Sequence, residues 1–413
     1  MQAYERLLKY VTISTASDES GTGTPTSERQ FDLARILVDE LTALGLDAML
    51  TDHCYVYGKL PATPGYEDRA RIGFIAHMDT APDFSGEGVK PRLIEHYDGS
   101  DVPLGNGETV LSTKDFPHLA SLRGRSLIVT DGTTLLGADD KAGIAEIMTM
   151  LETVVKNDLA HGPISVCFTP DEEVGAGTAC FDIPFFGADF AYTLDGGEEG
   201  EVVYENFNAA GALFEICGVN VHPGSAKDIM VNAVAVATEI NAALPSDEVP
   251  SRTCGRQGFY HLTNLSGTVE KATASYIIRD HDLARFEERK ATLRRIEKAM
   301  NEKYGEGTVT LKMRDQYYNM KEKILPVFGV VSLAVSATEA LGLTVSYSPV
   351  RGGTDGARLT ELGLPCPNLG TGGYAFHGPF EHITVEGMEK ATAVITEMVR
   401  LASMKTAKEI LTA

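Results

Sequence analysis

The sequence predicts an α/β protein with a mostly parallel sheet and a second domain inserted into the first. Short apolar strands alternate with helices in residues 1–208 and again in 318–413, and this alternation is the pattern of a parallel sheet covered by helices. Between residues 209 and 317 the order changes to strand, helix, strand, strand, helix, strand, which is typical of a ferredoxin-like βαββαβ module. A chain of 413 residues is also too long for one ordinary domain.

The first domain begins with two helices and continues with short strands. Amphipathic periodicity predicts helices over residues 3–11 and 27–45. The second helix follows Thr26 and Ser27, which are good N-cap types, and it stops at Gly45. We then expect apolar strands over 71–76, 127–129, 164–168 and 190–194, with a helix over 142–156.

The remaining elements belong to the inserted domain and to the return of the α/β pattern. In the inserted domain, strands are predicted over 212–218, 258–266, 272–279 and 308–314, and helices over 228–243 and 282–304. After residue 319 we expect helices over 327–341, 354–362 and 384–404 and a strand over 344–348.

Composition and charge argue against several classes of partner. The chain carries 36 basic and 58 acidic residues, a formal net charge of −22, without a Lys/Arg-rich run, so no nucleic-acid partner is expected. No apolar segment reaches the roughly 20 residues that span a bilayer, and the N-terminus lacks a signal-peptide core. The six scattered cysteines are typical of reduced thiols. We therefore expect a cytoplasmic protein without a membrane partner.

Acidic and histidine side chains gather where four consecutive predicted strands end. They are His77, Asp79, Asp139, Asp140, Asp171, Glu172, Glu173 and Asp195. Because ligands collect at the carboxyl ends of parallel strands, we expect these groups to converge in one crevice. Carboxylates held so closely repel one another unless cations compensate. Mixed His/Asp/Glu ligation suits zinc, with manganese or cobalt as substitutes, so the sequence predicts two divalent metal ions.

The motifs around these residues resemble those of the dinuclear zinc exopeptidases related to carboxypeptidase G and aminoacylase. The matching stretches are His77-Met-Asp79, Gly137-Ala-Asp-Asp-Lys-Ala-Gly143, Asp171-Glu-Glu-Val-Gly175, Asp195-Gly-Gly and the late His377. Further stretches, from Glu205-Asn-Phe-Asn-Ala-Ala210 to Pro365-Cys-Pro-Asn-Leu369, resemble the aminotripeptidases of this family in the same order. The resemblance implies a zinc-exopeptidase catalytic domain over 1–208 and 318–413, and a lid and dimerisation domain over 209–317.

The resemblance implies a metal ligand set. Asp139 would bridge the two metal ions. His77 and Asp195 would complete one site, and Glu173 and His377 the other. The family also implies a cis peptide bond between residues 139 and 140.

The resemblance also implies catalytic roles. Glu172 would be the general base for attack by a water that bridges the metals. Asp79 would orient the His77 imidazole by accepting its second N–H. His222, in the inserted domain, would donate a hydrogen bond to the oxyanion. Asp171 receives no catalytic role, and we expect capping or turn hydrogen bonds from it.

Substrate-binding residues are less well defined. Arg279 and Arg351 are candidates to clamp a peptide carboxylate, because a guanidinium pairs bidentately with it. Judged alone, each is as well explained by a surface salt bridge. Asn232, Asn206 and Asn208 are further polar candidates near the domain junction. Residues 198–201 form an acidic edge that either attracts the free amine of a peptide or is simply a solvated turn.

The leading functional hypothesis is a metal-dependent aminopeptidase that releases the N-terminal residue from tripeptides and acts as a homodimer. One alternative keeps the metals and changes the substrate, giving a deacylase or carboxypeptidase of the same family. Another is a non-catalytic protein that binds metal or peptide. The pair Glu172-Glu173 argues against it, since a pure binder needs no general base beside a ligand.

Overall fold

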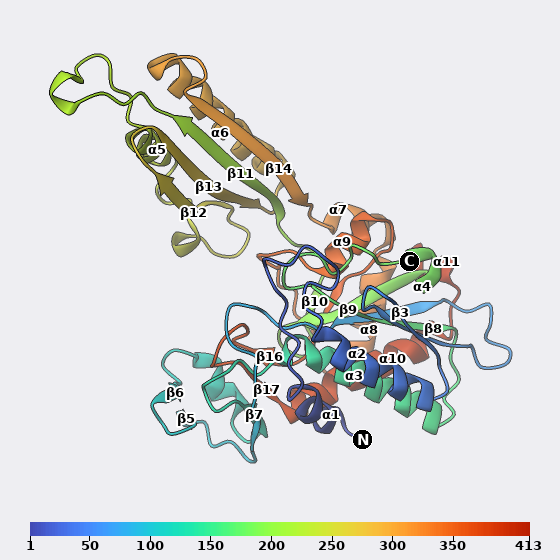
Figure 1. Ribbon diagram of the computed structural model, residues 1–413. Coiled ribbons are helices and arrows are strands. Elements are labelled where there is room, and N and C mark those ends of the chain that lie inside the picture. The colour runs from blue at the N-terminus through green and yellow to red at the C-terminus, as the bar shows by residue number, and fades with distance from the viewer. The chain divides into compact units, whose positions relative to one another are not determined.

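The computed structural model describes all 413 residues, and the chain divides into two compact units (Figure 1). Unit 1 comprises Met1–Tyr204, Glu322–Ser348 and Thr354–Ala413. Unit 2 comprises Glu205–Lys321 and the short segment Pro349–Gly353. Unit 2 therefore starts and ends a few residues outside the predicted 209–317, and it includes a segment that the sequence pattern assigned to the first domain.

Unit 1 is built on a seven-stranded sheet in the order β1-β2-β8-β3-β9-β15-β10. The strands are β1 Asp47–Leu50, β2 Val56–Leu60, β3 Ile72–His77, β8 Ile164–Thr169, β9 Phe190–Gly196, β10 Val202–Val203 and β15 Asn368–Gly370. The central strands β8, β3, β9 and β15 are parallel, whereas β1, β2 and β10 pair antiparallel at the edges. Every residue of β3 and β8 is buried, as expected for parallel strands covered on both faces.

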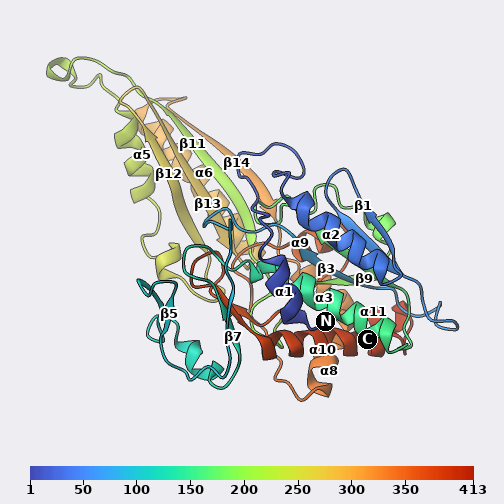
Figure 2. The same ribbon diagram turned by 60° about the horizontal axis from the view of Figure 1, so that its bottom comes forward.

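Helices also belong to unit 1, although the first residue of α7, Lys321, falls in unit 2. They are α1 Ala3–Tyr10, α2 Gln30–Ala43, α3 Ala138–Lys156, α4 Ile183–Phe186, α7 Lys321–Ile324, α8 Gly329–Ala340, α9 Asp355–Glu361, α10 Val385–Ala402 and α11 Ala407–Leu411. Helix α3 packs on β3 and β9, while α1 and α10 pack against α3 (Figure 2). The seven-stranded sheet and its helices are the predicted α/β architecture.

A second sheet in unit 1 corrects the predicted position of residues 127–129. These residues form β7 Leu127–Val129, which lies in a separate antiparallel sheet with β4 Arg92–Ile94, β16 Gly373–Tyr374 and β17 His382–Thr384. A further pair, β5 Val102–Leu104 and β6 Thr109–Leu111, lies in the same part of the chain. Strand periodicity identifies an apolar strand but not the sheet that it joins, and this is why the prediction was wrong.

Two other local predictions were wrong. Residues 344–348 form no strand and contribute only an isolated bridge between Ser346 and Glu201. Helix α2 begins at Gln30 without a side-chain cap, and neither Thr26 nor Ser27 caps it. Thr26 instead bonds to a residue of the acidic run, as described below.

Helix α3 starts earlier than its periodicity predicts. It begins at Ala138, and Asp139 and Asp140 have non-helical backbone angles within it. The peptide bond between these two aspartates is cis, which confirms the expectation drawn from the family resemblance. Gly137, with φ of +78°, precedes the helix in a left-handed conformation that favours glycine.

Unit 2 has the predicted βαββαβ order. Its elements are β11 Asn208–Cys217, α5 Ala233–Ala242, β12 Phe259–Gly267, β13 Lys271–Asp280, α6 Leu283–Tyr304 and β14 Val309–Tyr317. The antiparallel sheet has the order β12-β13-β11-β14. Alternate residues of β13 are buried, and α5 and α6 contact each other and the sheet, so both helices cover the same face.

No single helix has the length and apolar character needed to cross a membrane. One sharply bent pair of helical segments, Lys321–Val327 with Gly329–Ala340, meets that test by length and composition only.

Candidate metal centre

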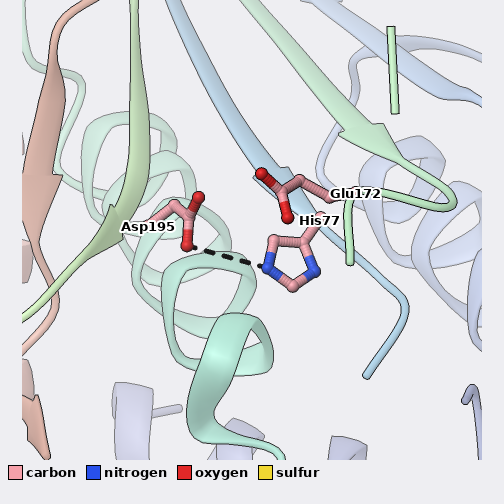
Figure 3. Close-up of side chains that lie close together, drawn as sticks. All are labelled: His77, Glu172 and Asp195. Atoms are coloured by element: carbon pink, nitrogen blue, oxygen red, sulfur yellow. Dashed lines mark ion pairs between the residues drawn. The ribbon is translucent and has the colours of Figure 1, made fainter. Parts of the chain in front are cut away.

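Neighbouring parallel strands bring the predicted ligands together. His77 is the last residue of β3, and it lies opposite Thr169 at the end of β8. Glu172 lies three residues beyond the end of β8, and Asp195 lies near the end of β9, on the other side of β3. Figure 3 shows His77, Glu172 and Asp195 turned toward one another at this edge of the sheet.

Asp139 lies between two imidazoles. Its Oδ1 is 3.0 Å from His77 Nε2, and its Oδ2 is 3.2 Å from His377 Nε2. His77 Nε2 is also 3.7 Å from Asp195 Oδ1, and His377 Nε2 is 3.1 Å from Glu173 Oε2. The structure therefore brings together all five residues proposed as metal ligands.

Asp139 reaches this position from an unexpected element. It does not follow a strand of the main sheet, as predicted, but projects from the non-helical start of α3. Two overlapping groups have ligand atoms within 4.8 Å of one another, His77 with Glu172 and Asp195, and His77 with Asp139 and Glu173. The first group includes Glu172, for which the family resemblance implies the role of base rather than ligand.

The buried carboxylates resist ionisation in the absence of cations. Burial raises the pKa of the Glu173 carboxyl to about 7 and that of Asp195 to about 6. Burial, and then the charge of Asp195, raise the pKa of Glu172 well above its ordinary value. Glu173 Oε1 is buried and accepts no hydrogen bond from the protein. A polar atom left in this way is costly, so a cation fits this set of donors.

The two imidazoles, in contrast to the carboxyl groups, have pKa values that favour their charged form. Hydrogen bonds with Asp139 and Glu173 raise the pKa of His377 to about 11. Burial lowers the pKa of His77, but hydrogen bonds with three aspartates outweigh burial and raise it well above its ordinary value. Burial likewise opposes ionisation of Asp139, but its bonds with both histidines keep its pKa low. The histidines thus supply positive charge that divalent metal ions would replace.

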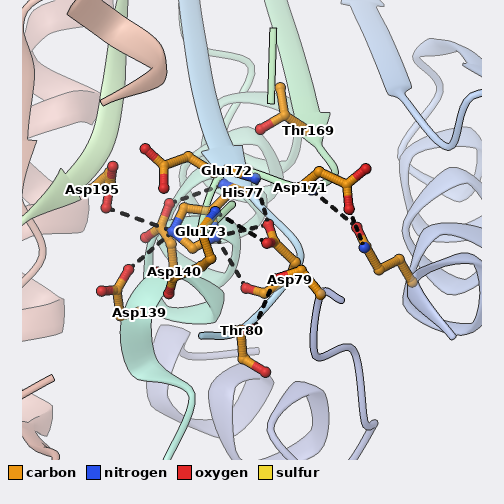
Figure 4. A network of polar contacts seen from close by, with 12 residues as sticks. His77, Asp79, Thr80, Asp139, Asp140, Thr169, Asp171, Glu172, Glu173 and Asp195 are labelled. Carbon is orange, nitrogen blue, oxygen red and sulfur yellow. Dashed lines mark hydrogen bonds and ion pairs between the residues drawn. The ribbon is translucent and has the colours of Figure 1, made fainter. Parts of the chain in front are cut away.

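Asp79 supports the site in more ways than the sequence indicated. Its Oδ1 and its main-chain oxygen lie 3.3 and 3.0 Å from His77 Nδ1. The same carboxylate accepts hydrogen bonds from the backbone N–H groups of Glu172, at 3.0 Å, and Glu173, at 3.2 Å. One buried carboxylate therefore fixes the imidazole of His77 and the backbone of the two glutamates (Figure 4).

Asp171 also anchors the acidic run. It is buried and has a left-handed φ of +56°. Its carboxylate accepts hydrogen bonds from the N–H and hydroxyl of Thr26, at 2.8 and 2.6 Å, and from Gln30 Nε2, at 2.6 Å. Gln30 Oε1 accepts from the backbone N–H of Asp171 in return, at 3.2 Å. The Asp171 side chain does form hydrogen bonds, as expected, but with backbone and side-chain groups of a distant segment rather than of its own turn.

Three buried residues near the site carried no predicted role. Asp140 accepts hydrogen bonds from the backbone N–H of His77, at 3.1 Å, and of Gly143, at 3.2 Å. Burial lowers the pKa of Lys141 to about 7, and its ammonium donates to Ile13 O at 2.7 Å. Asp355 accepts from the Thr169 hydroxyl at 2.7 Å. No neighbouring residue in the sequence indicates that Asp355 would contact Thr169. Asp140 and Lys141, in contrast, directly follow Asp139 in the motif Gly137–Gly143, so their position near the site could have been inferred.

The acidic edge at residues 198–201 is largely engaged within the protein. Glu199 pairs with Arg125 at 2.7 Å and with Lys390 at 3.0 Å. Glu201 accepts from the backbone N–H of Gly197 at 2.8 Å. These bonds oppose the idea that Glu199 and Glu201 attract a peptide amine.

The remaining candidates lie in unit 2. His222 Nδ1 accepts a hydrogen bond from Gly224 N–H at 3.1 Å. Asn232 caps α5 through its side-chain oxygen. Asn206 and Asn208 are buried, and their side chains bond to backbone groups within unit 2. The three asparagine side chains are therefore committed to local structure.

The two arginines differ in how many partners they have. Arg351 donates to Gly255 O at 2.7 Å, Gln257 O at 2.9 Å and the Thr253 hydroxyl at 2.9 Å. Arg279 uses a single nitrogen, Nη1, to donate to two backbone carbonyls, at 2.9 and 3.3 Å. Arg279 therefore keeps more donor capacity for a ligand.

The loop that carries His377 is closed by a small aromatic stack. Tyr374 pairs with His382 across β16 and β17, and the ring of His118 stacks on both. His382 is buried, and its Nδ1 is 2.7 Å from Phe380 O. If Nδ1 donates there, His382 Nε2 is unprotonated and accepts from His118 Nε2, 2.9 Å away.

This stack predicts acid sensitivity. Burial lowers the pKa of His382 to about 4. The unfolded chain therefore takes up a proton as pH falls through about 6.5, whereas the folded chain does not, and stability is lost between these values. We expect His382 to account for about 2 kcal/mol of the loss between pH 7 and pH 5. Urea unfolding of metal-free wild type and His382→Gln at both pH values measures this. An equal loss in both proteins would contradict it.

Comparisons with known proteins identify the class to which this fold and site belong. A family model described as the peptidase dimerisation domain matches residues 204–308. A tripeptidase from Staphylococcus aureus matches with a TM-score of 0.78 at 20% identity, covering 98% of both chains. A dinuclear metal-binding peptidase of the M20 family from Bacillus subtilis matches with a TM-score of 0.65 at 14% identity, covering 98% of this chain and 99% of that one. The fold is that of the M20 peptidases.

Other relatives are much more similar in sequence than the proteins of these solved structures. Peptidase T of Alkaliphilus oremlandii is 53% identical over 403 residues, which covers 97% of this chain and 98% of that protein. Peptidase T of Clostridium novyi is 52% identical, over 96% of this chain and 98% of its own length. The chain belongs to the peptidase T family and is a peptidase.

Proposed function

We propose that this peptidase is a metal-dependent aminopeptidase that releases the N-terminal residue from tripeptides. The observation that carries the proposal is the position of Glu172, a carboxylate beside the ligand cluster whose backbone is held by Asp79. The names of the relatives, peptidase T and a tripeptidase, support the substrate class. Six free cysteines and the absence of a single membrane-spanning helix support a cytoplasmic location.

We assign two divalent metal ions, zinc or alternatively manganese or cobalt, to this site. Asp139 would be shared, with His77 and Asp195 on one side and Glu173 and His377 on the other. Bound ions supply Lewis acidity, which polarises the substrate carbonyl and lowers the pKa of water. The histidine and carboxylate donors suit these ions better than calcium or magnesium, which prefer oxygen alone.

Glu172 acts as the general base in this proposal. Its carboxylate accepts a proton from the attacking water and delivers it to the nitrogen of the leaving dipeptide as the peptide bond breaks. Its pKa in the working enzyme must lie near neutrality, because the group must both take and give the proton. Asp79 keeps Glu172 and His77 in place during the reaction.

His222 is proposed as a donor to the developing oxyanion. Because its Nδ1 accepts from Gly224 N–H, the neutral ring carries its proton on Nε2. That tautomer leaves an N–H free to donate, which oxyanion stabilisation requires.

The substrate assignment is tested by comparing tripeptides with N-acyl amino acids and with dipeptides. We expect release of the N-terminal amino acid and a dipeptide from tripeptides, with slow turnover of the other substrates. Rapid deacylation with poor tripeptide cleavage would favour a deacylase. Release of the C-terminal residue instead would favour a carboxypeptidase.

A second prediction separates the two arginines. The Arg279 guanidinium has donors left to clamp the substrate carboxylate, whereas Arg351 is engaged by three acceptors. We expect Arg279→Ala to lower kcat/KM for a tripeptide about 10- to 100-fold, the range for loss of a charged hydrogen-bonded pair. We expect Arg351→Ala to act mainly on stability.

The control is a tripeptide whose C-terminal carboxylate is amidated. Amidation should penalise the wild type and Arg351→Ala but add little to the defect of Arg279→Ala, because both changes remove one interaction. Additive penalties in Arg279→Ala would show that Arg279 does not bind the carboxylate.

We also propose a homodimer. The match of residues 204–308 to a dimerisation domain supports this state. Light scattering of the purified protein over a range of concentrations measures it, and a monomer at every concentration would contradict it.

A further inference from the structure

A buried glutamate that the proposed mechanism does not use lies four residues beyond His377. Glu381 is 1% exposed. Its Oε2 accepts hydrogen bonds from the backbone N–H groups of Leu136, at 2.8 Å, and Gly137, at 2.9 Å. Its Oε1 accepts from the backbone N–H of Asp139 at 3.0 Å. One carboxylate thus binds three backbone donors of a single short segment.

These three donors are the ones that need a partner from elsewhere. They lie at and just before the start of α3, where backbone N–H groups have no acceptor within the helix. A carboxylate is well suited to this end of a helix, because it accepts hydrogen bonds and opposes the helix dipole. The bond to Asp139 also holds the backbone of the residue that lies between both imidazoles.

The segment that contains Glu381 also supplies His377. Residues 374–382 form a loop closed by the pairing of Tyr374 with His382, and Glu381 N–H bonds to Gly378 O at 3.2 Å within it. The same short loop therefore provides the side chain of His377 and, through Glu381, binds the backbone of Asp139. A shift of this loop would change both positions together.

We propose that Glu381 is a positioning residue that fixes Asp139 relative to His377 and so sets the geometry of the metal centre. This inference rests on the proposed metal centre. A cap that served only the stability of α3 would not need to reach Asp139, since two N–H groups of the segment are already paired through Oε2.

Glu381→Gln distinguishes these roles. A glutamine has one acceptor oxygen, and when that oxygen serves Leu136 and Gly137, its NH2 group faces the Asp139 N–H and repels it. The variant therefore removes the bond to Asp139 while changing no side-chain volume. Glu381→Asp keeps the charge but shortens the reach, and we expect it to be intermediate.

Glu386 offers a matched control in the same part of the chain. Both of its carboxylate oxygens accept from the backbone N–H of Ser126, at 2.9 and 3.0 Å, next to β7. Glu386→Gln therefore disturbs the same type of bond without touching the ligand cluster.

The readouts are metal affinity, measured with Zn²⁺ and a competing chelator, and the visible absorption spectrum of the Co²⁺-loaded protein. We expect Glu381→Gln to bind metal about 10- to 100-fold more weakly, the range for residues that orient metal ligands, and to alter the cobalt spectrum. We expect kcat to fall with little change in KM. Glu386→Gln should match the wild type in metal affinity and spectrum.

The outcomes separate this inference from the proposed function. If the wild type binds no metal stoichiometrically, the metal centre itself is wrong. If the wild type binds metal and Glu381→Gln binds it equally well with the same spectrum, Glu381 is only a helix cap and the inference fails. If Glu381→Gln does not fold, the same comparison is made with Glu381→Asp, and an unchanged spectrum there would overturn the proposal.

Discussion

Glu172→Gln is expected to lower turnover by about 10²- to 10⁴-fold while leaving the metal content near that of the wild type. The substitution keeps the shape of the side chain, but a neutral amide cannot accept the proton of the attacking water. The Glu172 backbone N–H would still bond to Asp79, so the loop should keep its position. Steady-state turnover of a tripeptide and metal analysis of the same preparation measure both effects.

The adjacent glutamate is the matched control. Glu173→Gln removes a carboxylate that contacts His377 Nε2 at 3.1 Å, so we expect it to lose metal as well as activity. Glu172 also belongs to a possible ligand group with His77 and Asp195, which gives a clear alternative. If Glu172→Gln loses as much metal as Glu173→Gln, Glu172 is a ligand rather than the base. Unchanged turnover would remove it from catalysis altogether.

Asp139→Asn is expected to lower binding of both metal ions and to reduce turnover by orders of magnitude. The two carboxylate oxygens of Asp139 face different imidazoles, His77 and His377, at 3.0 and 3.2 Å. An amide offers only one acceptor oxygen and no charge, so it cannot serve both sides. Metal content after dialysis against a fixed low concentration of free Zn²⁺ measures the loss.

Two further variants serve as a comparison and as a negative control for this measurement of metal content. Asp195 pairs with His77, at 3.7 Å, on one side of Asp139, so Asp195→Asn should weaken one ion more than the other. Asp131→Asn removes a carboxylate that pairs with the exposed Lys90, and it should change neither metal content nor turnover. If Asp139→Asn retains one ion as tightly as Asp195→Asn does, Asp139 does not bridge the pair.

The sequence grouped the residues that we propose as metal ligands more securely than it placed the elements that present them. His77, Glu173 and Asp195 follow or end strands of the main sheet, because an apolar run followed by a polar residue marks a strand end well. Asp139 also follows an apolar strand in the sequence, but this strand, β7, lies in another sheet. Its position comes from the start of α3, which hydrophobic periodicity does not detect.

The supporting contacts could not be predicted from the sequence. Asp171 is held by Thr26 and Gln30, which lie more than a hundred residues earlier in the chain. Thr26 followed by Ser27 resembles a helix cap locally, and only the folded chain reveals its distant acceptor. Pairwise polar contacts over such separations leave no periodic signal, in contrast to the alternation of buried residues in β13.

The short segment Pro349–Gly353 limits how unit 2 can be exchanged during evolution or in protein engineering. Val350 pairs with Asn206 in an isolated bridge, and Arg351 donates to the 253–257 loop, so this segment completes a module whose other residues, Glu205–Lys321, lie in a separate upstream stretch of the chain. A chimaera that transplanted only Glu205–Lys321 from a relative would receive the segment of its host instead. Recombination must therefore keep two separate gene segments compatible, the one that encodes Glu205–Lys321 and the one that encodes Pro349–Gly353.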